Sequence, residues 1–378
     1  MTHQGYPSLD EIYERLDRFV SDRPDIARTE SLGLSEENRE VRAVTVTDGR
    51  IPEEEKDVAV IVCGRHGDEL GARVVGPALL DWLASPEGEE TRRRQIVIVV
   101  PVANPDGCVH EEFGAPKDRL SETEEKTIGA LAKARRPDVV VDIHSWGPVD
   151  GEAVITANTS RAGEDVFIHE AIARKMAESA AAKGYPFLIH RCSLSGAYNN
   201  FYSGMCYESF HSLAFGMEVN HGFLSPEECA ESGVAAIQAL FEEGNTRSGW
   251  EPLAGYPAGI LGGEFLVFVG AAGGNAAERR ESRCEIWRNR DSFEWPWRTC
   301  PARHVFGAKM SYSGEKALSR GFRLVRQIRG CPEVKAVRMN GNSVEWSTCA
   351  DNSSTYVSVE IHPSGKGKEE YELAVEFC

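Results

Sequence analysis

Hydrophobic residues near the start of the chain recur with the spacing of one helical face. In residues 8–20, SLDEIYERLDRFV, the apolar positions lie three or four residues apart, as in an amphipathic helix. These positions are Leu9, Ile12, Leu16, Phe19 and Val20. Ser8 and Glu11 have the spacing of a capping box, in which each side chain bonds the other residue's backbone amide. The pattern predicts a surface helix packed on a core.

From residue 57 onward, short apolar runs alternate with helical patterns. The predicted strands are DVAVIVCG at 57–64, QIVIVVPV at 95–102, PDVVVDI at 137–143 and HSLAFGMEV at 211–219. The predicted helices cover about 69–84, 122–135, 163–183 and 225–243. Pro77, inside the first of these helices, indicates a kink or a later start. Continuous apolar strands separated by helices are typical of a mostly parallel, twisted α/β sheet with helices on both faces.

The pattern changes after a Gly/Pro-rich stretch, GWEPLAGYPAGILGG. Short runs that suggest strands follow, namely EFLVFVG, CEIWRN, VKAVRMNGNSVEW, TYVSVEIH and YELAVEF. Asn340 and Gly341, between two such runs, predict a tight hairpin turn. A length of 378 residues also favours more than one core. We therefore expect two domains: an α/β domain at residues 1–250 and a small antiparallel β-domain, sandwich-like, at residues 258–378.

Composition and charge exclude several classes of protein. The chain is 41% hydrophobic and 27% charged, and it has no apolar run near the roughly 20 residues that a membrane helix needs. The net charge of −17 is concentrated in residues 1–250, which hold 43 acidic and 25 basic residues. An acidic surface repels nucleic acid and anionic membranes. The N-terminus has no signal-peptide pattern, and the ten scattered cysteines suit reduced thiols, so the expected location is cytoplasmic.

Polar residues follow four of the predicted strands at their carboxyl ends. The four segments are CGRHGDE, PVANPDG, DIHSW and MEVNHG. In an open α/β sheet, this edge is where ligands bind. His66, Glu69 and His144 together form the two-histidine, one-carboxylate set of a catalytic zinc site. Glu218 ends the fourth strand in an apolar setting, which could keep its carboxylate basic enough to accept a proton.

Other catalytic patterns are missing from the chain. His169-Glu170 is followed by Ala173 where an H-E-x-x-H motif needs a histidine, and Leu70 stands where the inverted motif needs one. No Gly-x-Ser-x-Gly elbow occurs. His211 and His221 flank the strand that carries Glu218 and stay open as further candidates.

The four segments in this order resemble the carboxypeptidase A-like zinc metallocarboxypeptidases, also called funnelins. The resemblance runs from the N-terminal helix to about residue 245. It implies Zn²⁺ held by His66, Glu69 and His144, with Glu218 as general base. It also implies that Arg119, in KDRLSE, steadies the developing oxyanion. Asp142 is a candidate to orient a ligand histidine.

Two features of that family are missing here. The chain passes from Arg119 through SETEEKTIGALAKARRPD without the Asn-Arg pair that grips the substrate's C-terminal carboxylate in the family. Cys192 stands near the place of the family's phenolic tyrosine, ahead of Ser195-Gly196, and Tyr198 and Tyr202 come later. Arg191 or an arginine from elsewhere would have to bind the carboxylate.

These observations leave three functional hypotheses. The first is a zinc-dependent hydrolase, a metallocarboxypeptidase that releases C-terminal amino acids from peptides. The second keeps the chemistry but acts on small amides, as a deacylase of N-acyl amino acids or of cell-wall-like peptides. The third is a non-catalytic binding protein on the same scaffold. The β-domain could cover the rim of the active site, mediate oligomerisation or bind a partner.

Overall fold

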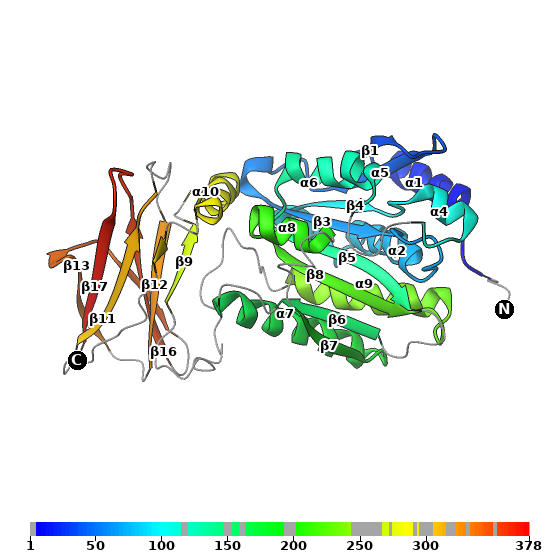
Figure 1. Cartoon of the computed structure of the whole chain (residues 1–378). Coiled ribbons are helices and arrows are strands. Elements are labelled where there is room, and N and C mark those ends of the chain that lie inside the picture. The colour runs from blue at the N-terminus through cyan, green and yellow to red at the C-terminus, as the bar shows by residue number, and fades with distance from the viewer. Residues whose placement is uncertain are drawn as a thin grey trace. The chain divides into compact units, whose positions relative to one another are not determined.

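The computed structural model describes residues 5–114, 120–146, 153–158, 163–192, 202–242, 267–271, 274–289, 293–294, 305–314, 322–329, 333–350 and 354–377. The chain divides into two compact units, Met1–Arg247 and Ser248–Cys378. Each unit is described by itself (Figure 1).

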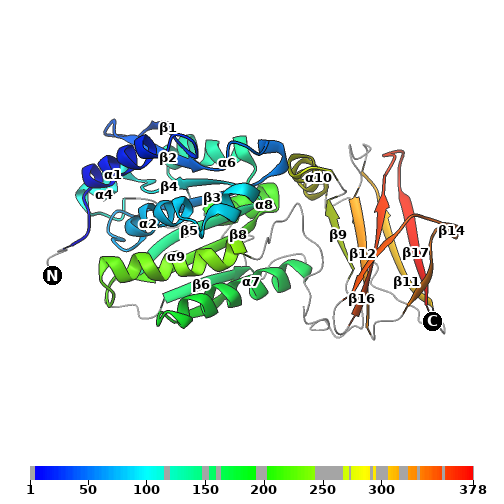
Figure 2. The same ribbon diagram turned by 180° about the vertical axis from the view of Figure 1, so that it is seen from behind.

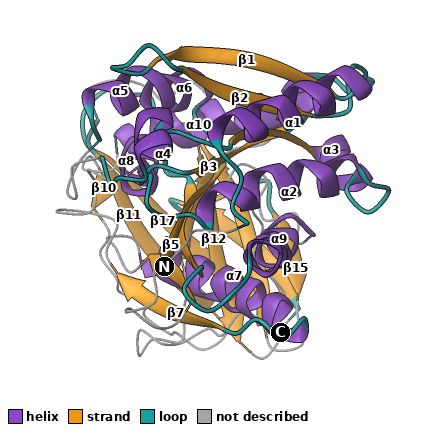
Figure 3. Ribbon diagram, turned by 90° about the vertical axis from the view of Figure 1, so that its right-hand side faces the viewer, coloured by secondary structure: helices purple, strands orange, loops and turns teal. Residues whose placement is uncertain are grey.

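The first unit is built on a mixed sheet with the order β1-β2-β4-β3-β5-β8-β6-β7 in the described residues. The strands are β1 (Ala27–Leu34), β2 (Glu40–Val46), β3 (Asp57–Cys63), β4 (Gln95–Val100), β5 (Val139–Trp146), β6 (Ala153–Asn158), β7 (Phe187–Cys192) and β8 (Leu213–Asn220). The central strands β4, β3, β5 and β8 run parallel, whereas β2 joins β4, and β6 joins β8, in antiparallel pairs. Seen from the side, β1 and β7 lie at opposite edges of the sheet (Figure 3). The predicted mixed, mostly parallel α/β sheet is confirmed.

Helices cover both faces of this sheet. One face carries α1 (Leu9–Asp22), α2 (Ala72–Ala84), α7 (Gly163–Ala182) and α9 (Pro226–Glu242), which lie in front of the strands in Figure 2. On the other face lie α6 (Ala130–Arg135) and α8 (Tyr202–Phe210), in front in Figure 1. The shorter helical segments are η1 (Glu53–Glu55), α3 (Glu89–Arg94), α4 (Pro105–His110), α5 (Glu122–Glu124) and the π-helical turn η2 (Glu125–Gly129).

The helix ends follow local sequence signals. In α1, the Ser8 side chain accepts from the Glu11 amide and the Glu11 carboxylate accepts from the Ser8 amide, so the predicted capping box is present. Ser225 and Glu228 make the same pair of contacts ahead of α9. Helix α2 begins at Ala72, three residues later than the pattern suggested. This later start still leaves Pro77 within the helix.

The strands that sequence reasoning missed include both edges of the sheet. In β1, the sequence ARTESLGL is largely polar, and of its eight residues only Ala27 is buried. Strand β3 is buried at every position, so its unbroken apolar run was readable. Strand β1 lacks this signal because most of its side chains are exposed or half-buried, and only strands covered on both faces read as continuous apolar runs.

The second unit contains two antiparallel sheets in its described residues, with the orders β10-β11-β17-β13-β14 and β15-β16-β12-β9. The elements are β9 (Val267–Ala271), α10 (Ala276–Arg288), β10 (Phe293–Glu294), β11 (Val305–Tyr312), β12 (Phe322–Arg329), β13 (Val334–Met339), β14 (Asn342–Ser343), β15 (Ser347–Ala350), β16 (Ser354–Ile361) and β17 (Glu369–Phe377). Residues from both sheets share one core, which includes Val337, Val357, Val359, Leu373 and Val375. The predicted hairpin turn is present, with Asn340 and Gly341 both at positive φ. The predicted sandwich-like β-domain is thus confirmed.

One predicted strand of this unit is wrong. The segment CEIWRN, residues 284–289, forms the end of helix α10 and its C-cap, not a strand. The reason lies upstream: Asn275 caps the helix and forms a capping box with Glu278, and the residues that follow are mostly strong helix formers. A six-residue window around Ile286 and Trp287 does not contain this start signal.

Among the residues that the structure describes, the free cysteine thiols are all buried: Cys63, Cys108, Cys206, Cys229 and Cys284. Cys63 lies in strand β3, whereas Cys108 and Cys206 lie in helices α4 and α8. Among the described helices, none combines the length and the hydropathy that crossing a bilayer requires.

Candidate metal centre

The carboxyl ends of β3, β4, β5 and β8 bring the predicted polar segments together. After β3 the chain turns at Gly64, whose φ is +60°, and enters the loop from His66 to Glu69. This loop packs against helix α4 at the end of β4. A Cβ atom on Gly67 would lie only 1.9 Å from the carbonyl carbon and oxygen of Gly107, so two backbones meet where no side chain fits. The glycine in the RHGDE segment therefore sets how closely the two loops approach.

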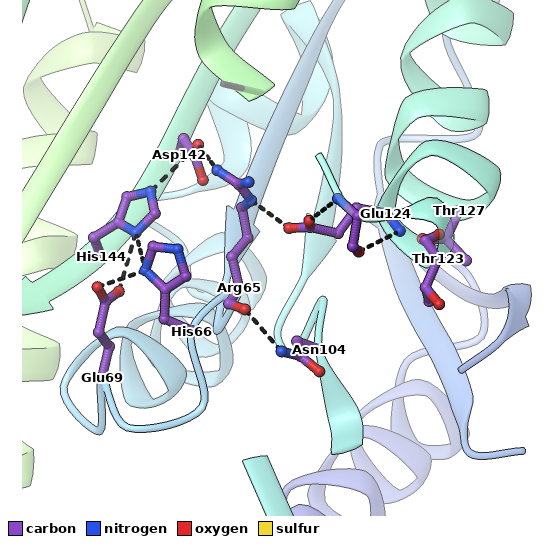
Figure 4. A network of polar contacts seen from close by, with 10 residues as sticks. Arg65, His66, Glu69, Asn104, Thr123, Glu124, Thr127, Asp142 and His144 are labelled. Atoms are coloured by element: carbon purple, nitrogen blue, oxygen red, sulfur yellow. Dashed lines mark hydrogen bonds and ion pairs between the residues drawn. The ribbon is translucent and has the colours of Figure 1, made fainter. Parts of the chain in front are cut away.

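Three side chains converge at this edge: His66, Glu69 and His144 (Figure 4). The Glu69 carboxylate lies between the two imidazoles, with Oε1 2.6 Å from His66 Nδ1 and Oε2 3.0 Å from His144 Nδ1. The two Nδ1 atoms are 3.2 Å apart. All three side chains are largely shielded from solvent. The structure thus brings together the three residues that the sequence predicted as ligands.

This arrangement fits a tetrahedral cation. Ligand atoms at about 2.0–2.2 Å from a tetrahedral zinc ion stand about 3.3–3.6 Å from one another. The nitrogen–nitrogen distance of 3.2 Å is close to this spacing, whereas the carboxylate oxygens lie nearer to the imidazoles, at 2.6 Å and 3.0 Å. The candidate ligand atoms of the three residues all lie within 4.8 Å of one another. Two imidazoles and a carboxylate facing one point are also the donor types that zinc prefers. The residues present therefore fit a zinc ion.

The electrostatics of the cluster favour positive charge at the same point. Burial alone would lower the pKa of His144, but the carboxylates of Asp142 and Glu69 raise it well above the usual range. Burial would likewise raise the pKa of Glu69, and His144, followed by His66, lowers it to about 2. A protonated imidazole or a divalent cation would each satisfy these carboxylates.

Each ligand is held by groups around it. Ser145 donates its backbone amide to Glu69 Oε2 at 3.2 Å, and the ring of Phe113 stacks on His66 with centroids 3.8 Å apart. Asp142 Oδ2 lies 3.3 Å from His144 Nε2, which leaves Nδ1 directed toward the cluster. This is the orienting contact that we expected for Asp142. Arg65, in turn, donates to Asp142 from the other side.

Glu218 lies beside this cluster on β8. In the register of the parallel strands β5 and β8, the partner of Glu218 is His144, so adjacent positions of the sheet carry the two residues. Burial raises the pKa of Glu218 to about 8; His144 acts against this shift, and Glu69 and Asp142 add to it. Its Oε2 is a buried oxygen with no hydrogen-bond partner among the described residues. Glu218 is therefore a buried carboxylate of raised basicity close to the candidate ligands.

The two further histidine candidates, His211 and His221, lie at opposite ends of β8. His221 follows the carboxyl end of β8, and its Nδ1 lies 2.8 Å from Ser145 Oγ, next to the cluster. His211 precedes β8 at its amino end, which is the edge of the sheet away from the cluster. His169 is buried, and its Nε2 accepts from the Ala214 amide, so it acts as a core residue.

Several predicted or discussed positions lie outside the described residues, namely Arg119, Ser195, Gly196 and Tyr198. In the second segment, Asn104 caps α4 and donates Nδ2 to the Arg65 carbonyl oxygen at 3.1 Å. Asp106 points elsewhere: its carboxylate bonds Ser35 and Arg39 in the turn between β1 and β2.

Sequence reasoning missed Arg65 and Glu124 as neighbours of the site. Arg65 is fully buried between the carboxylates of Glu124 and Asp142. Ser121 and Glu124 have the spacing of a capping box, so the local signal for α5 was present. Nothing in the local pattern shows that the same Glu124 carboxylate reaches Arg65, because that contact joins residues 59 positions apart.

Comparison with known proteins shows which proteins this part of the chain resembles. Residues 12–146 match the zinc carboxypeptidase family. Carboxypeptidase A2 of Mus musculus is 26% identical over 150 residues, which are 38% of this chain and 34% of the mouse protein. Carboxypeptidase A2 of Rattus norvegicus is 25% identical over 151 residues, with the same two shares. The chain thus spans about a third of the length of the curated relatives it matches.

Solved structures share the fold. A metallo-carboxypeptidase from Burkholderia cenocepacia aligns with a TM-score of 0.53 and 17% identity, over 64% of this chain and 70% of that chain. Bovine thrombin-activatable fibrinolysis inhibitor, solved with a tick carboxypeptidase inhibitor, aligns with a TM-score of 0.50 and 13% identity, over 63% of this chain and 97% of that chain. These findings confirm the predicted resemblance to zinc metallocarboxypeptidases and the fold that it implies.

Proposed function

We propose that this protein is a zinc metallopeptidase that removes C-terminal amino acids from peptides. The premise is that residues 12–146 match the zinc carboxypeptidase family. The observation that carries the proposal is the convergence of His66, Glu69 and His144 beside Glu218 at one edge of the sheet. One buried oxygen of Glu218 has no hydrogen-bond partner among the described residues, so it is available to accept a proton.

The metal would be held by His66 Nδ1, His144 Nδ1 and the Glu69 carboxylate. A zinc ion in such a site acidifies water and polarises the carbonyl of an amide. Asp142 keeps the His144 ring oriented through Nε2, and the Ser145 amide holds Glu69. These contacts fix the donor atoms before any substrate arrives.

Glu218 is the proton carrier of the proposed reaction. In its ionised form it takes a proton from the attacking water, and it then delivers that proton to the leaving nitrogen of the cleaved amide. A carboxylate whose pKa lies at about 8 holds a proton more firmly than an exposed glutamate does. A nearby divalent cation lowers this pKa, which favours the ionised form at neutral pH.

Arg119 remains the predicted partner of the developing oxyanion, from the resemblance alone. The substrate's C-terminal carboxylate needs a cationic partner as well, because the Asn-Arg pair of the family is missing from the sequence. The specificity for a free C-terminus is thus the part of the proposal that most needs an experiment.

The test is incubation of the purified protein with a defined peptide mixture, read by mass spectrometry with and without a chelator. Stepwise loss of single C-terminal residues, abolished by the chelator and restored by Zn²⁺, supports the proposal. Matched peptides with amidated C-termini serve as the control and should stay intact. Intact free peptides alongside hydrolysed N-acyl amino acids would instead identify a deacylase. A zinc-free, inactive protein would contradict enzymatic function altogether.

A further inference from the structure

Arg65 is a charged residue in the interior of the first unit, directly before the candidate ligand His66. Its side chain has no solvent exposure. Moving a guanidinium out of water costs several kcal/mol unless it is paired with good geometry. Arg65 is paired twice: Nε donates to Glu124 Oε1 at 2.7 Å, and Nη1 donates to Asp142 Oδ2 at 2.9 Å (Figure 4).

The Asp142 end of this network reaches a ligand. Asp142 Oδ2 lies 2.9 Å from Arg65 Nη1 and 3.3 Å from His144 Nε2, so one oxygen faces two donors. Asp142 and His144 are two residues apart on β5 and therefore share a face of the sheet. The side chain of Asp142 is only 2% exposed. Without Arg65, this carboxylate would be buried with a single partner and free to rotate away from His144.

The Glu124 end anchors the arginine to a different element. Glu124 Oε2 accepts from the Ser121 amide at 2.7 Å, so one carboxylate both completes the cap of α5 and holds Arg65. The carbonyl oxygen of Arg65 accepts from Asn104 at the start of α4. Helix α5, strand β5 and the start of α4 thus each hold Arg65, the residue next to His66.

We propose that Arg65 is a positioning residue for the metal centre. It keeps Asp142 in place and fixes the His144 ring with Nε2–H toward Asp142 and Nδ1 toward the metal, while its own anchors hold the backbone that leads into His66. The inference rests on the proposed metal site, but not on the identity of the substrate. Two carboxylates and one guanidinium also leave a negative balance beside the ligands, which favours a bound cation.

The variant R65M removes the charge and keeps much of the apolar volume. We expect its Zn²⁺ dissociation constant, measured by competition with a chromophoric chelator, to rise about 10- to 100-fold, the usual effect of losing an outer contact to a ligand. R65K keeps the charge but not the two-donor fork, so its loss should be smaller. Arg73 provides the matched control because it is also buried and bonds the Cys108 carbonyl oxygen instead of a carboxylate of the network. R73M should bind Zn²⁺ as the wild type does.

A double-mutant comparison tests the route through Asp142. In R65M/D142N the buried Asp142 carboxylate that R65M leaves with a single partner is gone as well, so the loss of affinity should be clearly less than the product of the two single losses. Multiplying losses would show that Arg65 and Asp142 act independently and would overturn the proposal. An unchanged or tighter dissociation constant in R65M would overturn it as well.

A second measurement needs no metal. In the metal-free wild type, the Nε2–H proton of His144 should give a downfield NMR resonance that is protected from exchange and is lost in H144Q. It should broaden or disappear in R65M and persist in R73M. If this resonance and the Zn²⁺ affinity are the same in R65M and the wild type, the positioning role is wrong while the hydrolase proposal stands. If both respond as expected but no peptide is cleaved, the hydrolase proposal is wrong while the positioning role stands.

Discussion

Replacing Glu218 with glutamine should make the metal-free protein more stable and the enzyme much less active. The pKa of Glu218 is raised to about 8 mainly by burial, and one of its oxygens lacks a hydrogen-bond partner among the described residues. Folding therefore favours the protonated side chain. A group whose folded pKa lies above its unfolded value of about 4.5 costs stability as the pH rises from that value toward 8. Glutamine has nearly the same shape and no such cost.

The size of the effect follows from the shift. At pH 5 the carboxylate should cost on the order of 1 kcal/mol relative to glutamine, and at pH 7 on the order of 3 kcal/mol. For a unit of this size, 3 kcal/mol corresponds to a rise of roughly 6–12 °C in the melting temperature of the first unit. Thermal unfolding of wild type and E218Q in excess chelator, from pH 5 to pH 8, measures the difference. The exposed Glu36 gives the control, and E36Q should follow the wild type at every pH.

The same substitution tests the catalytic role. Loss of a general base typically costs 10²- to 10⁴-fold in turnover, which is about 3–5 kcal/mol of transition-state free energy. Zn²⁺ affinity in E218Q should stay within a few fold of the wild type because the three ligands are untouched. A variant that is fully active would refute the assignment of Glu218. A variant no more stable than the wild type at pH 7 would refute the claim that burial makes ionisation of this carboxylate costly.

Three further predictions concern packing, the metal and the second unit. G67A should destabilise the first unit by at least about 2 kcal/mol and lower its Zn²⁺ affinity, because the added Cβ would overlap the backbone of Gly107. Denaturant unfolding and zinc titration measure the two effects. The control is G49A, which should show neither effect because the nearest atom to its added Cβ is 3.8 Å away. Adding Zn²⁺ at 100 times its dissociation constant should stabilise the metal-free protein by about 2.7 kcal/mol in calorimetry, and an unchanged transition would contradict a folded-state site. L373A removes a fully buried side chain from the β-domain core and should cost about 2–5 kcal/mol, seen by hydrogen exchange in strands β11, β13 and β17 but not in β3 or β5.

The sequence predicted the interior of the first unit better than its edges. Strand β3 is apolar at all but its first position, and the start of α1 carries a complete capping box, so local pattern and final structure agree. Strand β1 was missed because it has little apolar patterning. Strand β7 was missed because its apolar run covers only three residues, and the interior strands β2 and β6 were missed as well. Helix α10 was missed because its start signal lies at Asn275, outside the apolar window that was read as a strand.

For the candidate site, motif and topology together predicted which residues gather. Parallel strands deliver their carboxyl ends to one edge, so His66, His144 and Glu218 had to come near one another once the strands were correctly identified. The network around Arg65 could not be predicted in this way. Its contacts to Glu124 and Asp142 join residues 59 and 77 positions away, and no periodicity along the chain encodes which carboxylate a buried guanidinium meets.

The pairing of His144 with Glu218 in the β5–β8 ladder has a consequence for how such a protein can change over time. Backbone hydrogen bonds between two interior strands, rather than surface loops, fix the separation between the proposed ligand His144 and the proposed base Glu218, and a slip of one residue would turn one of them to the opposite face. Insertions or deletions in the surrounding loops can therefore change which molecule the site binds without moving the proposed catalytic residues. In this architecture, selectivity would depend on the loops and reactivity on the strands, which are separate parts of the chain.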